Sequence, residues 1–395
     1  MCAEIKENEE YLQSQLITYI GNKRALLDFI GQGVQIVQKK LKKEKLSCLD
    51  IFSGSGIVAR FLKQYSSELK VNDLEEYSVI INRCYLSNLT SKEKEKLQKL
   101  HASLIKKIDE RMEQLQKSRE DGTYKHPGFI SELYSPLDIQ NIQPEERCFY
   151  TPYNANYIDV ARQLIQTEIP EEYRHFFIAP LLSQASIHAN TAGIFKGFYK
   201  NSKTKTGQFG GNGKNALTRI LGKIELPFPV LSAHSCPFTV YHQNANELVE
   251  NPDLGSFDLA YFDPPYNQHP YGSNYFMLNL IAKYERPDTQ NISRVSGIPK
   301  DWNRSAYNKK KQVSRVFLDL IKKVDARFVL ISFNSEGFIS REVMQKLLSE
   351  CGKVVVLESQ YNAFRGSRNL SNREIHVKEF LFLVEKNSEK NQKRR

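Results

Sequence analysis

The residues best suited to chemistry are Asp263, Pro264, Pro265 and Tyr266, which follow an apolar run at 257–262. An exocyclic amine on a base attacks a methyl sulfonium poorly, because its lone pair is delocalised into the ring. A carboxylate and a backbone carbonyl that each accept one N–H would raise the electron density on that nitrogen. Asp263 can supply the carboxylate, and the Pro264 carbonyl can be the second acceptor because proline restricts φ. Tyr266 offers a ring for stacking a base taken out of a duplex. This chemistry requires no metal.

Asp-Pro-Pro also forms ordinary turns, so its position in the chain matters. A second candidate segment, LDIFSGSG at 49–56, follows another apolar run. Glycines there allow a ligand to approach the backbone closely, and Asp50 can hold an ammonium group. The segment has neither the G-x-G-x-x-G spacing nor a P-loop lysine, so it is not predicted to be a dinucleotide or phosphate cradle.

Two further polar positions lie near this glycine loop in the sequence. Asp73 directly follows the next apolar run, about 20 residues after the glycine loop, where a carboxylate can bind both hydroxyls of a ribose. A helix N-cap is an equally good interpretation of Asp73. Leu74 can pack against an adenine ring. Lys23, in the segment Tyr19-Ile20-Gly21-Asn22-Lys23, can face a ligand carboxylate or a DNA phosphate, although such a segment alone is often just a turn.

The elements that must position these residues follow a β-α-β pattern. Short apolar runs predict strands at 46–52 and 69–72, and helical spacing predicts helices at 18–43, 57–65 and 75–86. The pattern breaks between about 121 and 235, and returns with strands at 238–241, 257–262 and 327–333 and a closing hairpin of 353–357 with 379–384. We therefore expect an α/β, doubly wound sheet with an insertion. The predicted parts are 1–87 and 234–386 for the sheet domain, 88–233 for the inserted region and 387–395 for a basic, disordered tail.

The inserted region carries the main candidates for contacts with nucleic acid. An amphipathic helix is predicted at 90–119, with a charged face whose role is open. The segment KGFYKNSKTKTGQFGGNGK mixes lysines, aromatics and glycines, and its candidate DNA-binding residues are Lys196, Lys200, Lys203, Lys205 and Lys214. The net charge of +11 agrees with a polyanionic partner, but many proteins are basic without one.

The composition also bears on the compartment. There is no run of about eighteen apolar residues that could span a membrane, and the acidic, polar start has no signal core. Cys2, Cys48, Cys84, Cys148, Cys236 and Cys351 are scattered, which argues against a zinc site or a disulfide framework. We expect a cytoplasmic protein with reduced thiols.

Taken in order, LITYIGNKRALL, DIFSGSG, VND and AYFDPPY resemble the alpha group of N6-adenine DNA methyltransferases, the Dam-like family. The resemblance implies a Rossmann-like, S-adenosylmethionine-dependent methyltransferase sheet with an inserted target-recognition domain. It implies that Asp263, Pro264, Pro265 and Tyr266 form the catalytic element. The implied cofactor contacts are Tyr19, Lys23, Asp50, Phe52, Gly54, Gly56, Asp73, Leu74, Asn244 and Asp263; Asn244 lies where the family often has an acidic residue.

A looser resemblance links HANTAGIFKGFYK and YNAFRGSRNLSNREIHVKEFLFLVEK to members of type II restriction-modification systems. It makes Arg365, Arg368 and Arg373 candidates for phosphate contacts around a flipped base, although an exposed basic hairpin explains them equally well. It also suggests a companion restriction endonuclease. The expected function is site-specific transfer of a methyl group from S-adenosylmethionine to adenine N6 in double-stranded DNA.

Four other functions are compatible with parts of this sequence. An RNA adenine methyltransferase would use the same chemistry, and the long insertion favours duplex DNA over it. N4-cytosine and protein-glutamine methyltransferases usually have Ser and Asn, respectively, where this chain has Asp263. A catalytically silent DNA-binding module on this fold is disfavoured by the intact Asp263 and glycine loop.

Overall fold

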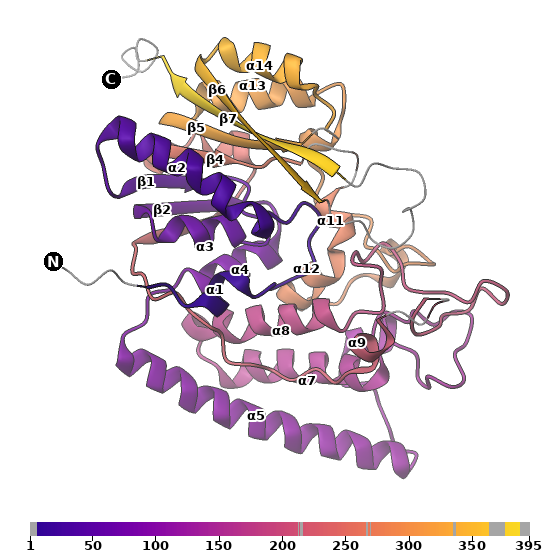
Figure 1. The fold of residues 1–395 in the computed structure, drawn as a ribbon. Coiled ribbons are helices and arrows are strands. Elements are labelled where there is room, and N and C mark those ends of the chain that lie inside the picture. Colours follow the sequence, from indigo (N-terminus) through magenta and orange to yellow (C-terminus); the bar gives the residue numbers. More distant parts are fainter. Residues whose placement is uncertain are drawn as a thin grey trace.

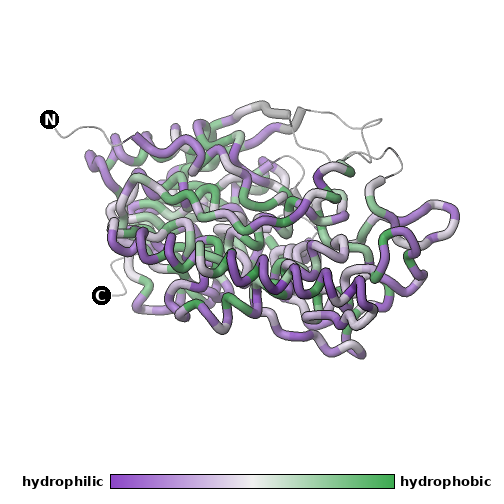
Figure 2. The backbone as a smooth tube through the Cα atoms, turned by 90° about the horizontal axis from the view of Figure 1, so that it is seen from below, coloured by the Kyte–Doolittle hydropathy of each residue, from purple (hydrophilic) through white to green (hydrophobic). Residues whose placement is uncertain are grey.

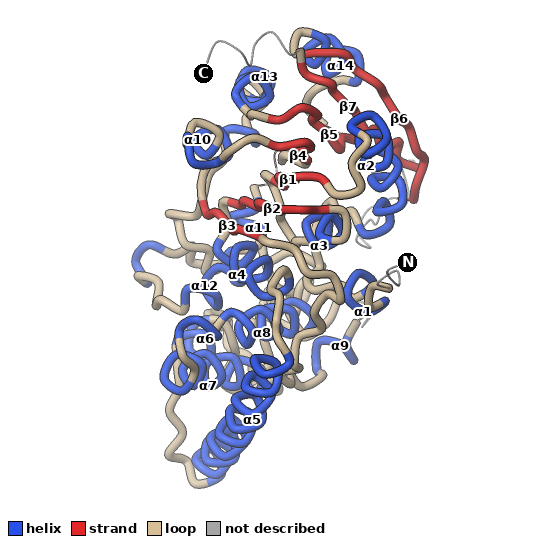
Figure 3. Tube along the Cα trace, turned by 90° about the vertical axis from the view of Figure 1, so that its left-hand side faces the viewer, coloured by secondary structure: helices blue, strands red, loops and turns tan. Residues whose placement is uncertain are grey.

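The computed structural model describes residues 6–211, 213, 216–265, 268, 270–334, 337–362 and 376–387. Its centre is a seven-stranded sheet in the order β3-β2-β1-β4-β5-β7-β6 (Figures 1 and 3). The strands are β1 (Leu46–Asp50), β2 (Ser66–Asp73), β3 (Phe238–His242), β4 (Phe257–Phe262), β5 (Ala326–Asn334), β6 (Gly352–Asn362) and β7 (His376–Lys386). The first five strands are parallel, and β7 is antiparallel to both β5 and β6. The expected α/β fold and the closing hairpin are confirmed.

The order of the parallel strands creates the crevice in which ligands bind in such sheets. Strand β1 pairs with β2 on one side and with β4 on the other, with Cys48 opposite Leu259. Strands β2 and β3 are therefore added on one side of β1, and β4 and β5 on the other. The loops that follow β1 and β4 diverge to opposite faces of the sheet. Because parallel strands end at the same edge, the segments after β1, β2 and β4 meet there.

Helices cover both faces of the sheet because side chains alternate along each strand. On one face, α2 (Leu27–Leu41) and α3 (Ile57–Lys63) bury their apolar sides against Leu259 and Tyr261 of β4. On the other face, α10 (Ala245–Leu248), α13 (Val313–Lys323) and α14 (Arg341–Ser349) pack against Ala260 and Phe262. Consecutive residues of β4 thus enter two different cores, which explains why its sequence is apolar throughout.

The region between β2 and β3 forms a helical layer at the β3 side of the sheet. Its helices are α5 (Ser91–Glu120), α6 (Phe129–Leu133), α7 (Pro152–Glu168), α8 (His175–Ile187) and α9 (Leu217–Leu221). Helix α8 packs on α4 (Glu76–Tyr85) and α12 (Phe276–Lys283), and α7 lies between α8 and the outermost α5 (Figure 1). One apolar core joins Tyr77 of α4, Phe177 of α8 and Phe276 of α12. The prediction of separate domain boundaries at 88 and 233 is untested, but the apolar core crosses both.

Helix α5 shows why this sequence forms a long helix at the surface. A capping box of Thr90 and Glu93 starts it, and Leu97, Leu104 and Ile108 face the core. Most of its other residues are hydrophilic, as Figure 2 shows for the helix seen from below. The sequence analysis missed α7, although Thr151 caps its start and Pro152 occupies its first turn.

Shorter elements complete the described chain. They are α1 (Glu9–Gln13), α11 (Tyr271–Asn274), and the 3-10 turns η1 (Arg24–Leu26), η2 (Glu171–Tyr173), η3 (Pro252–Leu254), η4 (Thr289–Asn291) and η5 (Ala306–Asn308). The five described cysteines are buried, and none forms a disulfide with another described residue. Among the described helices, none has the length and apolarity needed to cross a membrane.

Candidate active site

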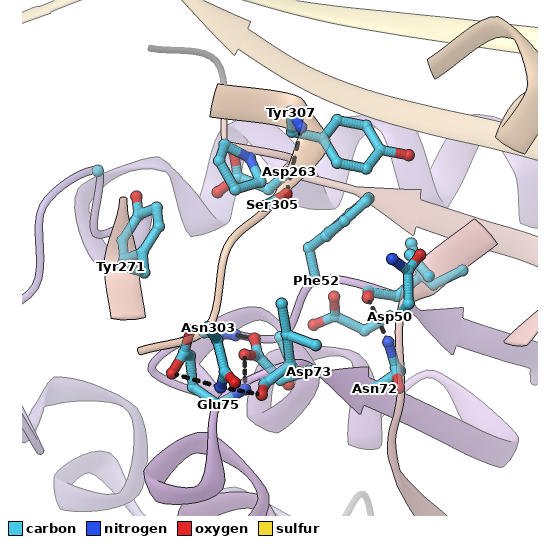
Figure 4. Close-up of a pocket in the computed structure, with 18 of the residues that line it drawn as sticks. Asp50, Phe52, Asn72, Asp73, Glu75, Asp263, Tyr271, Asn303, Ser305 and Tyr307 are labelled. Atoms are coloured by element: carbon cyan, nitrogen blue, oxygen red, sulfur yellow. Dashed lines mark hydrogen bonds between the residues drawn. The ribbon is translucent and has the colours of Figure 1, made fainter. Parts of the chain in front are cut away.

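A cavity of about 550 Å³ opens at the carboxyl ends of β1, β2 and β4 (Figure 4). This volume is within the range of small-molecule sites. Its lining brings together most of the residues predicted from the sequence, namely Tyr19, Lys23, Asp50, Phe52, Gly54, Asp73, Leu74, Asn244, Asp263 and Pro265. Gly56 lies behind the glycine loop as the N-cap of α3, and Pro264 is buried next to Asp263. Tyr266 lies outside the described residues.

Asp73 holds the glycine loop in place. One carboxylate oxygen accepts the Gly54 N–H at 2.7 Å, and the other accepts the Glu75 N–H at 2.9 Å. Gly54 has a φ of 53°, and a Cβ there would lie 2.9 Å from the Tyr19 ring. The loop can therefore pass this close to Tyr19 only with a glycine. Burial raises the pKa of Asp73, and the two N–H groups oppose that rise.

Asp50 is a buried carboxylate at the end of β1 that faces the cavity. Neither oxygen makes a hydrogen bond of normal geometry to a described residue. Burial raises the Asp50 pKa, and the charges of Asp263 and Asp73 raise it further, while the backbone N–H groups of Phe52 and Ala59 oppose the shift. A buried carboxylate without a partner is costly, so this position suits a cationic group of a ligand.

Asp263, which is partly buried, belongs to an ionic cluster with the buried side chains of Lys23 and Glu379. The Lys23 ammonium lies 3.4 Å from Asp263 Oδ1 and 2.8 Å from Glu379 Oε1. Glu379 Oε1 also accepts the Ser332 hydroxyl at 2.7 Å. Burial raises the pKa of Asp263 to about 6; Lys23 opposes this shift and Glu379 adds to it. The sequence analysis did not single out Glu379. The feature that could have indicated it is a lone carboxylate in the apolar run at 379–384.

Three tyrosines connect the Lys23 segment to the chain after Asp263. Tyr19 stacks on both Tyr271 and Tyr275, with ring centroids 5.0 Å apart in each case. The Tyr271 hydroxyl donates to the Ile20 carbonyl at 3.0 Å, and the Ile20 N–H donates to the Tyr275 hydroxyl at 2.8 Å. These contacts hold the segment that contains Lys23 and helix α11 in fixed positions relative to each other at the edge of the cavity.

An aromatic wall forms another side of the cavity. Phe52 meets the edge of Tyr307, with ring centroids 5.1 Å apart. The Tyr307 hydroxyl donates to Asn246 at 2.8 Å. Asn244, predicted near an adenine, lines the cavity here, and its side-chain oxygen accepts the Asn246 N–H as the cap of α10. The sequence analysis missed Tyr307, a lone aromatic within the polar segment 303–315.

Glu75 is a carboxylate that lines the cavity and that the sequence analysis did not single out. Its side chain accepts a hydrogen bond from Asn279 of α12 at 2.5 Å. It accepts another from Asn303 at 3.1 Å (Figure 4). Burial raises the pKa of Glu75 to about 7. Glu75 thereby ties the segment around Asn303 to the floor of the cavity.

The predicted DNA-binding lysines that the structure describes lie on the inserted region. Lys196, Lys200, Lys203 and Lys205 are exposed, and none of them lines the cavity. The turn that carries the last three is fixed by Asn190, whose buried side chain donates to the Cys148 and Gln208 carbonyls at 2.7 and 2.8 Å. The other DNA-binding candidates, Lys214, Arg365, Arg368 and Arg373, lie outside the described residues.

Comparison with known proteins agrees with this geometry. A family model described as D12 class N6 adenine-specific DNA methyltransferase matches residues 19–347. The type II methyltransferase M.NlaIII of Neisseria lactamica is 31% identical over 94% of this chain and 99% of its own length. M.CviAII of Paramecium bursaria Chlorella virus 1 is 29% identical over 93% and 98%. M.FokI of Planomicrobium okeanokoites is 27% identical over 93% of this chain, which corresponds to 52% of that protein.

Proposed function

Because this chain belongs to the D12 class of N6-adenine-specific DNA methyltransferases, we propose that its cavity binds S-adenosylmethionine and receives the target adenine beside Asp263. Membership in the family makes the chain an adenine-specific DNA methyltransferase. What the proposal adds is the donor, the roles of individual residues and the way in which the base reaches them.

The observation that carries this proposal is that Asp50, the last residue of β1, and Asp263, directly after β4, face one cavity. The residues that line this cavity suit S-adenosylmethionine. The unpartnered Asp50 carboxylate suits a cationic group of the cofactor, and Asp73 lies at the end of β2, where a ribose is expected. Phe52 and Tyr307 supply apolar rings for an adenine. When bound, the cofactor supplies an electrophilic methyl group on its sulfonium.

The residues of the chain would then activate and orient the amine. The Asp263 carboxylate accepts one N6 hydrogen and the Pro264 carbonyl accepts the other, which raises the electron density on nitrogen. Once the nitrogen has gained its fourth bond, it must lose one proton, and Asp263 is the acceptor beside it. With a pKa of about 6, Asp263 is ionised near neutral pH and returns that proton readily to water. The rest of the rate enhancement comes from positioning.

We further propose that the enzyme acts on double-stranded DNA and turns the adenine out of the stack, because an N6 group inside a duplex cannot reach a cavity of this kind. Residues 88–233 would read the sequence. The exposed lysines on the turn held by Asn190 would contact phosphates, as the charge of +11 favours. A protective role beside a companion restriction endonuclease is proposed from the type II methyltransferases among its relatives.

The experiment is long-read sequencing of DNA from a methylation-free host that expresses the protein, with modified adenines identified at each position. We expect N6-methyladenine in one short motif. Asp263→Asn should abolish it while cofactor binding persists. The matched control is Asp258→Asn on the same strand β4, where the carboxylate pairs with Lys43 at 2.7 Å outside the cavity; it should keep the modification.

Two results would count against the proposal. Near-normal methylation by Asp263→Asn would remove Asp263 from the chemistry. Unmodified DNA with a wild-type protein that binds S-adenosylmethionine would favour RNA as the substrate, and the same measurement on cellular RNA would test that.

A further inference from the structure

The ionic cluster around Asp263 contains a residue to which neither the family match nor the chemistry above gives a role. Glu379 lies on β7, where its backbone pairs with Asn334 of β5, and its side chain is fully buried. Oε1 receives hydrogen bonds from Lys23 and Ser332. Oε2 has no hydrogen-bond partner among the described residues. A carboxylate this deeply buried is rare unless it is paired, and Glu379 pairs with Lys23, which also contacts Asp263.

Among the described residues, the cluster contains more carboxylates than cations. Lys23 is the cation that lies between two carboxylates, closer to Glu379 at 2.8 Å than to Asp263 at 3.4 Å. Glu379 therefore draws the ammonium away from Asp263. A full, close ion pair between Lys23 and Asp263 would lower the proton affinity of Asp263 and occupy the oxygen that the amine must reach.

Other titratable groups also face Asp263. Asp50 approaches from the end of β1, and the buried Tyr261 hydroxyl approaches from β4. Asp50 has no ion-pair partner among the described residues, and Tyr261 is neutral in the normal pH range. The proton affinity of Asp263 is therefore governed by the charge of Lys23 and by that of Glu379, which shares the Lys23 ammonium.

We propose that Glu379 is a positioning residue that holds Lys23 as a shared cation and thereby sets the place and the basicity of the Asp263 carboxylate. The inference rests on the proposed function, in which Asp263 must be ionised to accept the amine hydrogen. Its predicted direction follows from the charges: without the negative charge of Glu379, Lys23 pairs fully with Asp263, and the carboxylate stays ionised to lower pH.

The test is the single-turnover methylation rate of a DNA duplex, with saturating S-adenosylmethionine, measured from pH 5 to 8. Glu379→Gln leaves one cation beside one carboxylate, so the variant should fold. The acidic limb of its pH–rate profile, where the rate falls as Asp263 becomes protonated, should move down by about one pH unit. At pH 5, the rate as a fraction of each enzyme's own plateau should then be several-fold higher in the variant than in the wild type. The plateau itself should fall, because Asp263 becomes a weaker acceptor.

The matched control is Glu385→Gln on the same strand, where the carboxylate pairs with Lys40 and Arg327 away from the cavity. Its profile should overlie the wild type. Lys23→Met should move the limb up, and the double variant Lys23→Met with Glu379→Gln should return it toward the wild-type position because both charges are removed.

An unmoved limb in Glu379→Gln would overturn the inference, since a purely structural role lowers the rate without moving the limb. A double variant that matches Lys23→Met alone would overturn it too. Failure of the proposed function is seen separately, as a wild-type enzyme that does not methylate the duplex.

Discussion

We expect the Asp50 carboxylate to lower the stability of the fold and to raise the affinity for the cofactor. The substitution Asp50→Asn tests both effects. The carboxylate is buried, and its oxygens lack hydrogen-bond partners among the described residues. Replacing it with a neutral amide should stabilise the cofactor-free fold by about 1–2 kcal/mol. For a chain of this size, that raises the melting temperature by about 1–2 °C. The control Asp258→Asn removes a paired carboxylate instead and should lower it.

The pH dependence follows from the raised pKa of Asp50 in the folded state. In the unfolded chain, Asp50 ionises once the pH exceeds its ordinary pKa of 3.8, whereas in the folded chain burial opposes its ionisation. The wild type therefore loses stability as pH rises above that value. The advantage of Asp50→Asn should be present at pH 7.5, shrink as the pH falls, and vanish near pH 4 in melts recorded across this range.

The same substitution should weaken cofactor binding. A hydrogen bond to a charged group contributes about 1.5–3 kcal/mol, which corresponds to about 10- to 150-fold in Kd. Titration calorimetry with S-adenosylmethionine and with S-adenosylhomocysteine locates the contact. Equal losses for both place the ammonium at Asp50, and a loss confined to S-adenosylmethionine places the sulfonium there. Unchanged affinity for both, together with a lower melting temperature at pH 7.5, would refute the reasoning.

Two other substitutions give simpler outcomes. Gly54→Ala should reduce cofactor affinity at least about tenfold, because its Cβ overlaps the Tyr19 ring; Gly122→Ala has a similar positive φ with open space around it and should bind normally in the same calorimetric assay. Asn190→Ala should weaken DNA binding by about tenfold in fluorescence anisotropy, because the basic turn loses its support, and should leave cofactor affinity unchanged. Loss of cofactor binding in Asn190→Ala would show instead that the whole fold is disturbed.

The sequence predicted most of the fold because its strands are short, apolar and closed by glycine or polar residues. The run at 257–262 matches β4, and the helix expected at 90–119 is α5 within one residue at each end. The cavity residues at the ends of β1, β2 and β4 could be placed together because parallel strands share an edge. Helix α7 lies where the βα pattern breaks, and that pattern gave no expectation for the segment 152–168.

The remaining parts of the site depend on contacts that sequence spacing does not contain. Lys23 was expected to face a cofactor carboxylate or a DNA phosphate, and the structure places its ammonium against two carboxylates of the chain. That arrangement requires β7 to insert between β5 and β6, an order that the hairpin pattern alone does not specify. Tyr307 reaches Phe52 only because the segment before α13 folds back over the end of β1.

The apolar core that joins α4, α8 and α12 has a consequence for building hybrid enzymes. A target-recognition region with its own core could be exchanged between relatives at its two boundaries. Here, Phe177 of the inserted region packs in the same core as Tyr77 and Phe276 of the catalytic part. A transplanted insertion would meet unfamiliar partners on α4 and α12. Chimeras that test the proposed role of residues 88–233 in sequence recognition should therefore carry those two helices along, so that the shared core stays intact.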